Sequence, residues 1–128
     1  MARSKEEKAA YDKAWRVAYY RTEKGLAYMR AANKRARQRN HDYIKAIKEN
    51  ATCMDCGVKY PYYVYDFDHR EPCDKDDVVS RVAQRGVGIP RLQAELDKCD
   101  IVCSNCHRER THRWRLETGR YRERISDR

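Results

Sequence analysis

Two short cysteine pairs organise this sequence, CMDC at Cys53–Cys56 and CSNC at Cys103–Cys106. In each pair two residues separate the cysteines, so one turn can present both sulfurs to one ion, and zinc prefers four such tetrahedral thiolates. One pair alone would also fit a redox motif or a disulfide, but two pairs favour a metal site. We therefore predict a closed, structural zinc site made of Cys53, Cys56, Cys103 and Cys106. The remaining cysteines, Cys73 and Cys99, are expected to be buried small hydrophobes or surface thiols.

The composition is typical of a small domain that depends on such a site. The chain has 128 residues, charged residues make up 38% of it, and its mean hydropathy is −1.10. A chain that buries so little apolar surface usually needs disulfides or a structural metal. No apolar leader opens the sequence and no apolar run is long enough to span a bilayer. We expect a cytoplasmic protein, where cysteine pairs more often bind metal than form disulfides.

The net charge of +9 is concentrated at one end. Residues 1–50 hold 14 Lys and Arg against 6 Asp and Glu, a net of +8, whereas residues 51–128 hold 15 against 14, a net of +1. A basic helix is often only a solvated face, but this much like charge repels itself and indicates a polyanionic partner, with DNA as the main expectation. The expected phosphate contacts are Arg30, Lys34, Arg35, Arg37 and Arg39, joined by Arg108 and Arg110 near the second cysteine pair.

Residues 1–50 are expected to form a basic helical arm, and residues 51–128 a separate module. Ser4 and Glu7 match a capping box, and good helix formers continue to residue 49 with a break or kink near Gly25. The aromatic residues of the arm have two interpretations: packing against the module, which we favour, or stacking on bases and sugars. These residues are Tyr11, Trp15, Tyr19, Tyr20 and Tyr28.

In the module we predict a strand over residues 62–68 and short helices over 74–85 and 90–96. A final helix is expected from His107 to Leu116. Gly57 is expected to adopt the left-handed conformation of a metal-binding turn, and Gly86 to end a helix. The fold class is therefore α+β and mostly helical.

The predicted strand places acidic and histidine side chains between the two cysteine pairs. Alternation along a strand puts Asp66 and Asp68 on one face and His69 on the other. His107 directly follows the last cysteine, so a zinc ion joining residues 53 and 106 would also bring His107 close to this strand. An Asp and a His together form an open site for a divalent cation, with water and substrate phosphate in the other positions.

These motifs together resemble the HNH endonuclease family: the two cysteine pairs, DFDHREP at residues 66–72 and CHRERTH at residues 106–112. The resemblance covers about residues 51–115 and rests on seven spaced positions. It implies a zinc-stapled ββα-metal nuclease module, with two strands and a helix around one catalytic ion. Basic arms are common in phage-type members, so the resemblance also implies a phage or host DNA-processing protein as a partner, and the host cytoplasm as the location if the chain is phage-encoded.

The resemblance gives three residues a role in hydrolysing phosphodiester bonds. Asp68 and His107 would hold one divalent ion (Mg²⁺, Mn²⁺ or another) at the scissile phosphate and the leaving 3′ oxygen. His69 would be the general base, a role that suits a side chain with a pKa of about 6.5. Asp66 or the carbonyl network around the strand is expected to orient His69.

One position departs from the family pattern. The Asn that usually braces the loop carrying the base is replaced by Lys98, so that either other groups brace the loop or catalysis is weak. His112 is expected at the surface or on a phosphate, with a catalytic or metal-binding role as the alternative. The main alternative function is a non-catalytic, zinc-stapled nucleic-acid-binding module. A protein-interaction zinc domain fits less well, because it needs no Asp-His strand.

Overall fold

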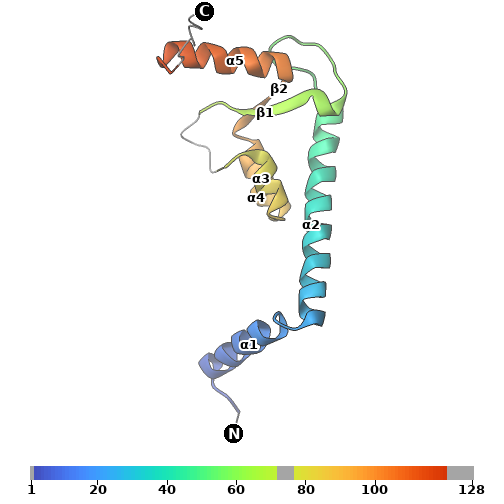
Figure 1. Cartoon of the computed structure of the whole chain (residues 1–128), viewed down its shortest axis with the longest axis vertical. Helices are drawn as coiled ribbons and strands as arrows, with labels where there is room; N and C mark the ends of the chain where they lie inside the picture. The colour runs from blue at the N-terminus through green and yellow to red at the C-terminus, as the bar shows by residue number, and fades with distance from the viewer. Residues whose placement is uncertain (1, 72–76, 121–128) are drawn as a thin grey trace, which may run out of the picture.

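The computed structural model describes residues 2–71 and 77–120, and the chain is α+β and mostly helical, as expected (Figure 1). The elements in chain order are α1 (Lys5–Tyr19), α2 (Glu23–Glu49), the 3-10 helix η1 (Tyr62–Val64), β1 (Tyr65–His69), α3 (Val79–Gln84), α4 (Ile89–Leu96), β2 (Cys99–Cys103) and α5 (Ser104–Glu117). Helix α2 connects α1 at one end with the other elements at its opposite end. Within the described residues no helix combines the length and apolar character needed to cross a membrane.

The arm consists of two helices that meet at a fixed corner. Helix α1 begins with the predicted capping box, in which Ser4 and Glu7 satisfy each other's backbone N–H groups. Thr22 caps α2: its hydroxyl donates to the Tyr19 carbonyl (2.6 Å) and accepts from the Gly25 N–H (3.0 Å). A Cβ atom on Gly25 would lie 2.0 Å from that same carbonyl oxygen, so the corner accepts only glycine.

The aromatic residues of the arm do not pack against the module, and the favoured interpretation of them was wrong. Tyr11, Trp15 and Tyr28 are 50%, 56% and 55% exposed. Trp15 instead stacks on Tyr19 within α1, with ring centroids 5.1 Å apart. The reason is the corner, which directs α1 away at the end of α2 that is remote from the sheet (Figure 1).

The C-terminal half of α2 contributes to the core of the module. Its side chains Tyr43, Ile44 and Ile47 pack against a buried cluster from α3, α4 and β2, which consists of Val79, Val82, Ala83, Leu92, Leu96 and Cys99. Asn40 of α2 is fully buried and donates to the carbonyls of Ala83 (3.1 Å) and Val87 (3.0 Å), at the end of α3. The arm is thus anchored by packing and by buried hydrogen bonds, while a boundary at residue 50 stays a prediction.

The two strands form an antiparallel pair whose register runs from Tyr65 opposite Cys103 to His69 opposite Cys99. Strand β1 starts later than predicted, because residues 62–64 form η1. Gly57 has φ of +69°, which confirms the expected left-handed turn, and Gly86, with the same φ, follows the C-cap of α3 as the expected end of that helix. The helix predicted over residues 74–85 is present as α3 from residue 79, and residues 72–76 lie outside the described part of the chain.

Candidate active site and metal centre

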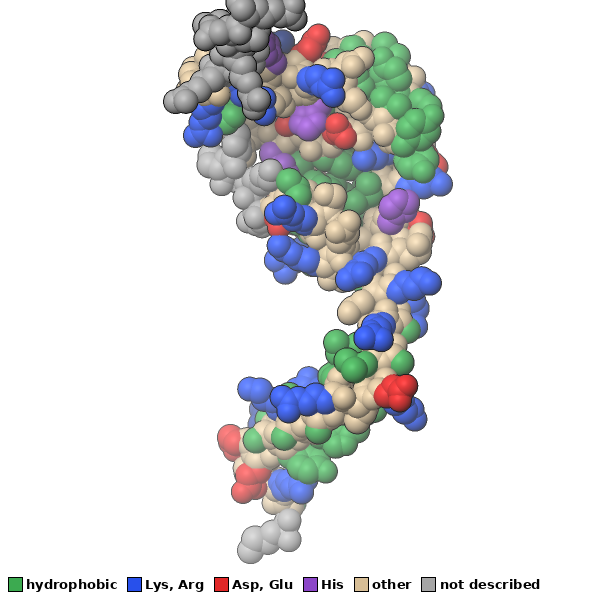
Figure 2. All heavy atoms as spheres, viewed as in Figure 1, with side chains coloured by type: hydrophobic (Ala, Val, Ile, Leu, Met, Phe, Trp, Pro, Cys, Tyr) green, Lys and Arg blue, Asp and Glu red, His purple; other side chains and the backbone are tan. Residues whose placement is uncertain are grey.

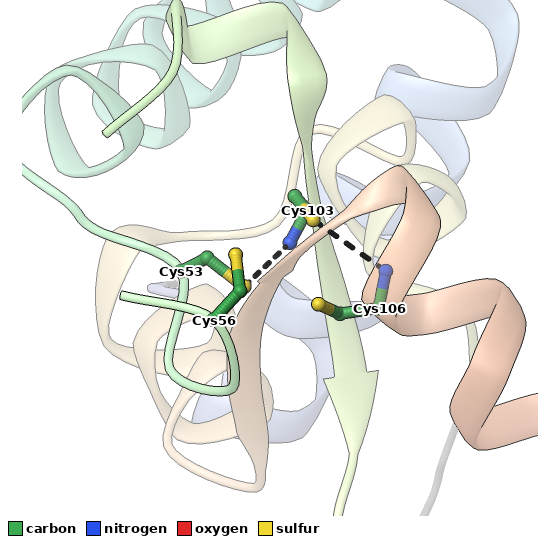
Figure 3. A group of neighbouring side chains, drawn as sticks. All are labelled: Cys53, Cys56, Cys103 and Cys106. Carbon is green, nitrogen blue, oxygen red and sulfur yellow. Dashed lines mark hydrogen bonds between the residues drawn. The ribbon is translucent and has the colours of Figure 1, made fainter. Parts of the chain in front are cut away.

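The four cysteines of the two pairs lie together. Their sulfur atoms are all within 4.8 Å of one another, a spacing compatible with one structural metal ion such as zinc (Figure 3). Cys53 and Cys56 come from the loop before η1, whereas Cys103 ends β2 and Cys106 lies in the first turn of α5. The cluster therefore ties the loop after α2 to the strand and helix that face it.

Backbone N–H groups point at these sulfur atoms, as a thiolate site requires. The Cys103 N–H donates to Cys53 Sγ (3.2 Å) and the Cys106 N–H donates to Cys103 Sγ (3.5 Å). Burial alone would raise the pKa of Cys53, but hydrogen bonds from the backbone of Cys56, Cys103 and Asp55 lower it to about 6. A thiolate is the form that binds metal, so this environment favours coordination by Cys53. Hydrogen bonds among the neighbouring thiols, with Cys103 first, raise the pKa of Cys106.

Cys99 is separate from the cluster. It is buried in the core beside α4, and its thiol donates to the Glu95 carbonyl at 3.4 Å. Burial raises the pKa of Cys99 to about 11, as expected for an inert core thiol. Cys73 lies outside the described residues.

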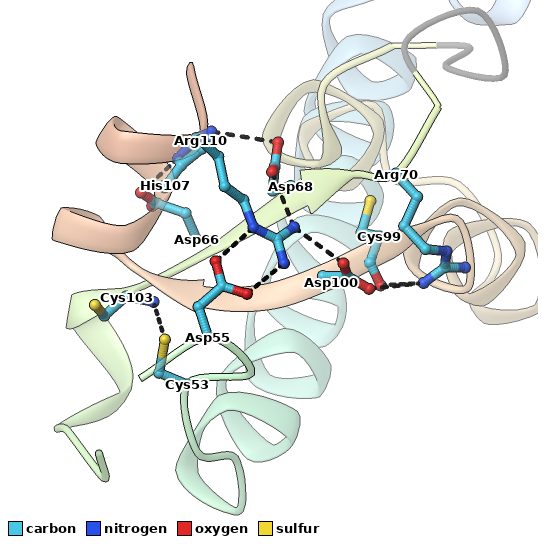
Figure 4. Close-up of polar contacts among 10 residues, drawn as sticks. All are labelled: Cys53, Asp55, Asp66, Asp68, Arg70, Cys99, Asp100, Cys103, His107 and Arg110. Atoms are coloured by element: carbon cyan, nitrogen blue, oxygen red, sulfur yellow. Dashed lines mark hydrogen bonds and ion pairs between the residues drawn. The ribbon is translucent and has the colours of Figure 1, made fainter. Parts of the chain in front are cut away.

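His107 lies between the two aspartates of β1. Its Nδ1 atom is 3.0 Å from Asp66 Oδ2, and its Nε2 atom is 3.6 Å from Asp68 Oδ1 (Figure 4). His107 is in the first turn of α5, which the cysteine cluster holds against the sheet. The structure thus brings together Asp68 and His107, the two predicted ligands of a divalent cation, and adds Asp66 on the opposite side of the imidazole.

Arg110 forms hydrogen bonds with three carboxylates, one of which belongs to Asp68 beside His107. It binds Asp55 through two hydrogen bonds of 2.6 Å each, Asp68 Oδ2 at 3.2 Å and Asp100 Oδ2 at 2.9 Å (Figure 4). The hydrogen bonds from Arg110 hold the pKa of Asp55 below its ordinary value. The sequence predicts that Arg110 contacts phosphate. In the structure its N–H groups instead bind Asp55, which lies between Cys53 and Cys56, and one aspartate on each strand.

We expect Arg110→Ala to lower the free energy of unfolding by about 2 kcal/mol. This value lies between the cost of breaking a buried ion pair and the cost of breaking an exposed one, because the Arg110 side chain is 25% exposed. Arg110→Lys should recover only part of the loss, because an ammonium cannot match the fork that binds Asp55. Urea denaturation of the zinc-loaded protein measures the free energy of unfolding of both Arg110 variants. Arg108→Ala, on the exposed face of α5, is the control. Equal midpoints for Arg110→Ala and the control would contradict this role.

His69 faces away from His107, as strand alternation predicts. Its Nε2 atom is 2.6 Å from Glu95 Oε1 of α4, and the two side chains are 8% and 3% exposed. Lys98 donates to the other oxygen of Glu95 at 2.9 Å. Burial would raise the pKa of Glu95, but the hydrogen bonds from Lys98 and His69 leave it below its ordinary value. The expected pairing of Asp66 with His69 is wrong, because Asp66 contacts His107 and Glu95 takes its place at His69.

The position that departs from the family pattern has a role in this arrangement. Lys98 contacts Glu95, and the Lys98 carbonyl also accepts a hydrogen bond from the Arg70 N–H (3.0 Å), directly after His69. Both contacts tie the end of β1 to the turn between α4 and β2. Lys98 therefore braces the segment that carries His69, through an acidic neighbour and its own backbone.

Two of the predicted phosphate-binding residues of α2 also hold the arm in place. Arg37 donates to the Gln84 carbonyl and Arg39 to the Val87 carbonyl, each at 2.8 Å. Arg30, Lys34 and Arg37 line a hollow of about 840 Å³ between α2 and the sheet. Arg35 and Arg108 are exposed. Figure 2 shows Lys and Arg side chains along α2, and a group of His and acidic side chains at the end of the molecule away from α1.

Comparison with known proteins returned no match among family models, curated proteins or solved structures. The fold and the cluster define an α+β chain with a four-cysteine site that can hold a structural metal ion. The likeness to the HNH family therefore rests on the residues quoted above.

Proposed function

We propose that this chain is a metal-dependent DNA endonuclease of the HNH type. The observation that carries the proposal is the position of His107, with Nδ1 on Asp66 and Nε2 facing Asp68. A histidine that binds a metal ion through one nitrogen commonly donates its other N–H to a carboxylate. Asp66 would thus be the orienting group, and Asp68 and His107 the ligands.

The donor atoms fit a small divalent cation. Two ligands at right angles around Mg²⁺ lie about 3 Å apart when each metal–ligand distance is about 2.1 Å. His107 Nε2 and Asp68 Oδ1 are 3.6 Å apart, and Arg110 holds the other oxygen of Asp68, so Oδ1 remains available toward His107. Both side chains keep some exposure, 35% and 24%, which leaves room for water and a phosphate.

Hydrolysis then needs a base, an attacking water and a stabilised leaving group. A bound cation would supply charge stabilisation at the phosphate and at the leaving 3′ oxygen. In the proposed reaction the His69 ring nitrogen that does not contact Glu95 takes a proton from water, and the water oxygen bonds to phosphorus. The bond from phosphorus to the 3′ oxygen breaks, and this oxygen takes a proton from a second water molecule. Glu95 orients the His69 ring through its contact with Nε2.

The test is cleavage of supercoiled plasmid by zinc-loaded protein in Mg²⁺ or Mn²⁺. We expect nicked or linear products with either ion and none in its absence. Asp66→Asn should reduce the rate about 10- to 100-fold, because loss of an orienting carboxylate has this effect in metal sites. Glu109→Gln, an exposed acidic residue of α5, is the matched control and should cleave at the wild-type rate. Absence of cleavage by the wild-type protein in every divalent metal would contradict the proposal.

A second candidate, a non-catalytic zinc module that binds nucleic acid, is favoured by the burial of His69. A buried histidine and glutamate with a purely structural role would make the same contact as His69 and Glu95. The two functions differ in the plasmid assay, because a binding module retards DNA in a salt-dependent way without cutting it.

A further inference from the structure

The hollow between α2 and the sheet combines a cationic wall with an apolar floor. Basic side chains of α2 line one side, namely Arg30, Lys34, Arg37, His41, Lys45 and Lys48. Ile44, Phe67, Val79 and Ala83 line the floor, and Asp66 and His107 lie at one end. Its volume of about 840 Å³ is in the range of pockets that enclose a ligand of drug size, which includes a nucleotide.

Two tyrosines of η1 stand at the edge of this hollow. Tyr63 is 72% exposed, and its ring meets that of Tyr62 edge to face with centroids 5.6 Å apart. Lys45 places its ammonium 4.8 Å from the centroid of the Tyr62 ring. Tyr63 is too exposed to serve the core, so its ring is available to a ligand.

A second hollow continues beyond the candidate site. It has a volume of about 580 Å³ and is lined by Ser104, Arg108, Thr111, His112 and Arg115 of α5. Asp66 and His107 line both hollows, so the proposed cation ligand His107 lies where they meet. A strand passing from one hollow to the other would therefore pass His107 with basic side chains on both sides of it.

We propose that the substrate segment bound here is single-stranded DNA, with bases against Tyr63 and the apolar floor and phosphates along α2. In a duplex the base faces are stacked on one another and cannot contact an aromatic ring or an apolar floor. An unpaired strand offers both base faces and phosphates, the combination that aromatic and cationic grooves bind. This inference rests on the proposed endonuclease function and specifies its substrate class.

The test is the fluorescence anisotropy of a labelled oligonucleotide, single-stranded or annealed to its complement, without added divalent cation. We expect the single strand to bind the full-length protein at least about tenfold more tightly. Tyr63→Ala should weaken single-strand binding about fivefold or more, the usual effect of losing one base-stacking ring. Leu116→Ala is the control, since Leu116 is also an exposed apolar side chain but lines neither hollow.

A paired lysine experiment tests the path of the phosphates. Lys34→Ala should reduce the slope of log affinity against log salt by about 0.7 for a single strand. Lys24→Ala, an exposed lysine of α2 outside the hollow, should leave the slope unchanged. Equal affinity for duplex and single strand, or no effect of Tyr63→Ala, would overturn the inference. Because no cleavage is involved, preferential single-strand binding with no cutting of the plasmid or of the single strand in any divalent metal would refute only the endonuclease.

Discussion

Replacing Cys103 by serine is expected to release the metal and unfold the chain beyond residue 50. A structural zinc ion in a small domain contributes about 10–16 kcal/mol to folding, and whole domains are stable by only about 5–15 kcal/mol. Cys103 also ends β2 and caps α5, with its sulfur accepting the Cys106 N–H. Serine is a favoured N-cap residue and can still accept the Cys106 N–H, so the expected loss comes from the missing metal ligand.

Zinc content and circular dichroism measure this result, and Cys99→Ala provides the matched control. Cys99 is equally buried but lies outside the cluster, so this variant should keep a full equivalent of zinc and lose only a small part of its stability. Helical signal from the arm should persist in Cys103→Ser while the cooperative thermal transition disappears. A zinc-free Cys103→Ser protein with an unchanged transition would show that the cluster is not structural.

The second large effect is expected at His69, where His69→Ala should reduce plasmid cleavage by about 10²- to 10⁴-fold. This is the range for loss of a general base. The variant also leaves the carboxylate of Glu95 buried with Lys98 as its remaining described partner, so some loss of stability accompanies it.

His69→Gln separates the two contributions. Glutamine can donate a hydrogen bond to Glu95 but cannot accept a proton from water at neutral pH. We expect the melting temperature of His69→Gln to be closer to that of the wild type than the melting temperature of His69→Ala is. We expect the two variants to be equally inactive. Full activity in His69→Gln would assign His69 to the structure alone and leave the reaction without its proposed base.

The local features of this chain were predictable from its sequence because each depends on neighbouring residues. The capping box of Ser4 and Glu7, the left-handed Gly57 and the spacing of the cysteines are all of this kind. Alternation along β1 also placed His69 opposite Asp68 correctly. The cysteine pairs then predicted a long-range contact, because a shared metal ion requires one.

The partners of the site residues could not be predicted in the same way. Glu95 meets His69 and Arg110 meets Asp55 only because of how α4 and α5 pack on the sheet. Periodicity indicates which face of an element is buried but does not indicate which residue of another element lies opposite. A signal was present for Asp66, since alternation already separated it from His69 and put it on the face toward His107.

The length of α2 fixes how far α1 lies from the candidate site and in which direction it points. The helix has 27 residues, which at about 1.5 Å per residue gives a rigid spacer of about 40 Å. Asn40 anchors one part of α2 and Gly25 fixes the corner with α1. The segment between them therefore sets both the distance of α1 from the module and its rotation about the axis of α2. Deleting one residue there would move α1 inward by about 1.5 Å but turn it by about 100° around the helix axis. Insertions and deletions in this segment therefore change the direction of α1 much more than they change its distance from the module.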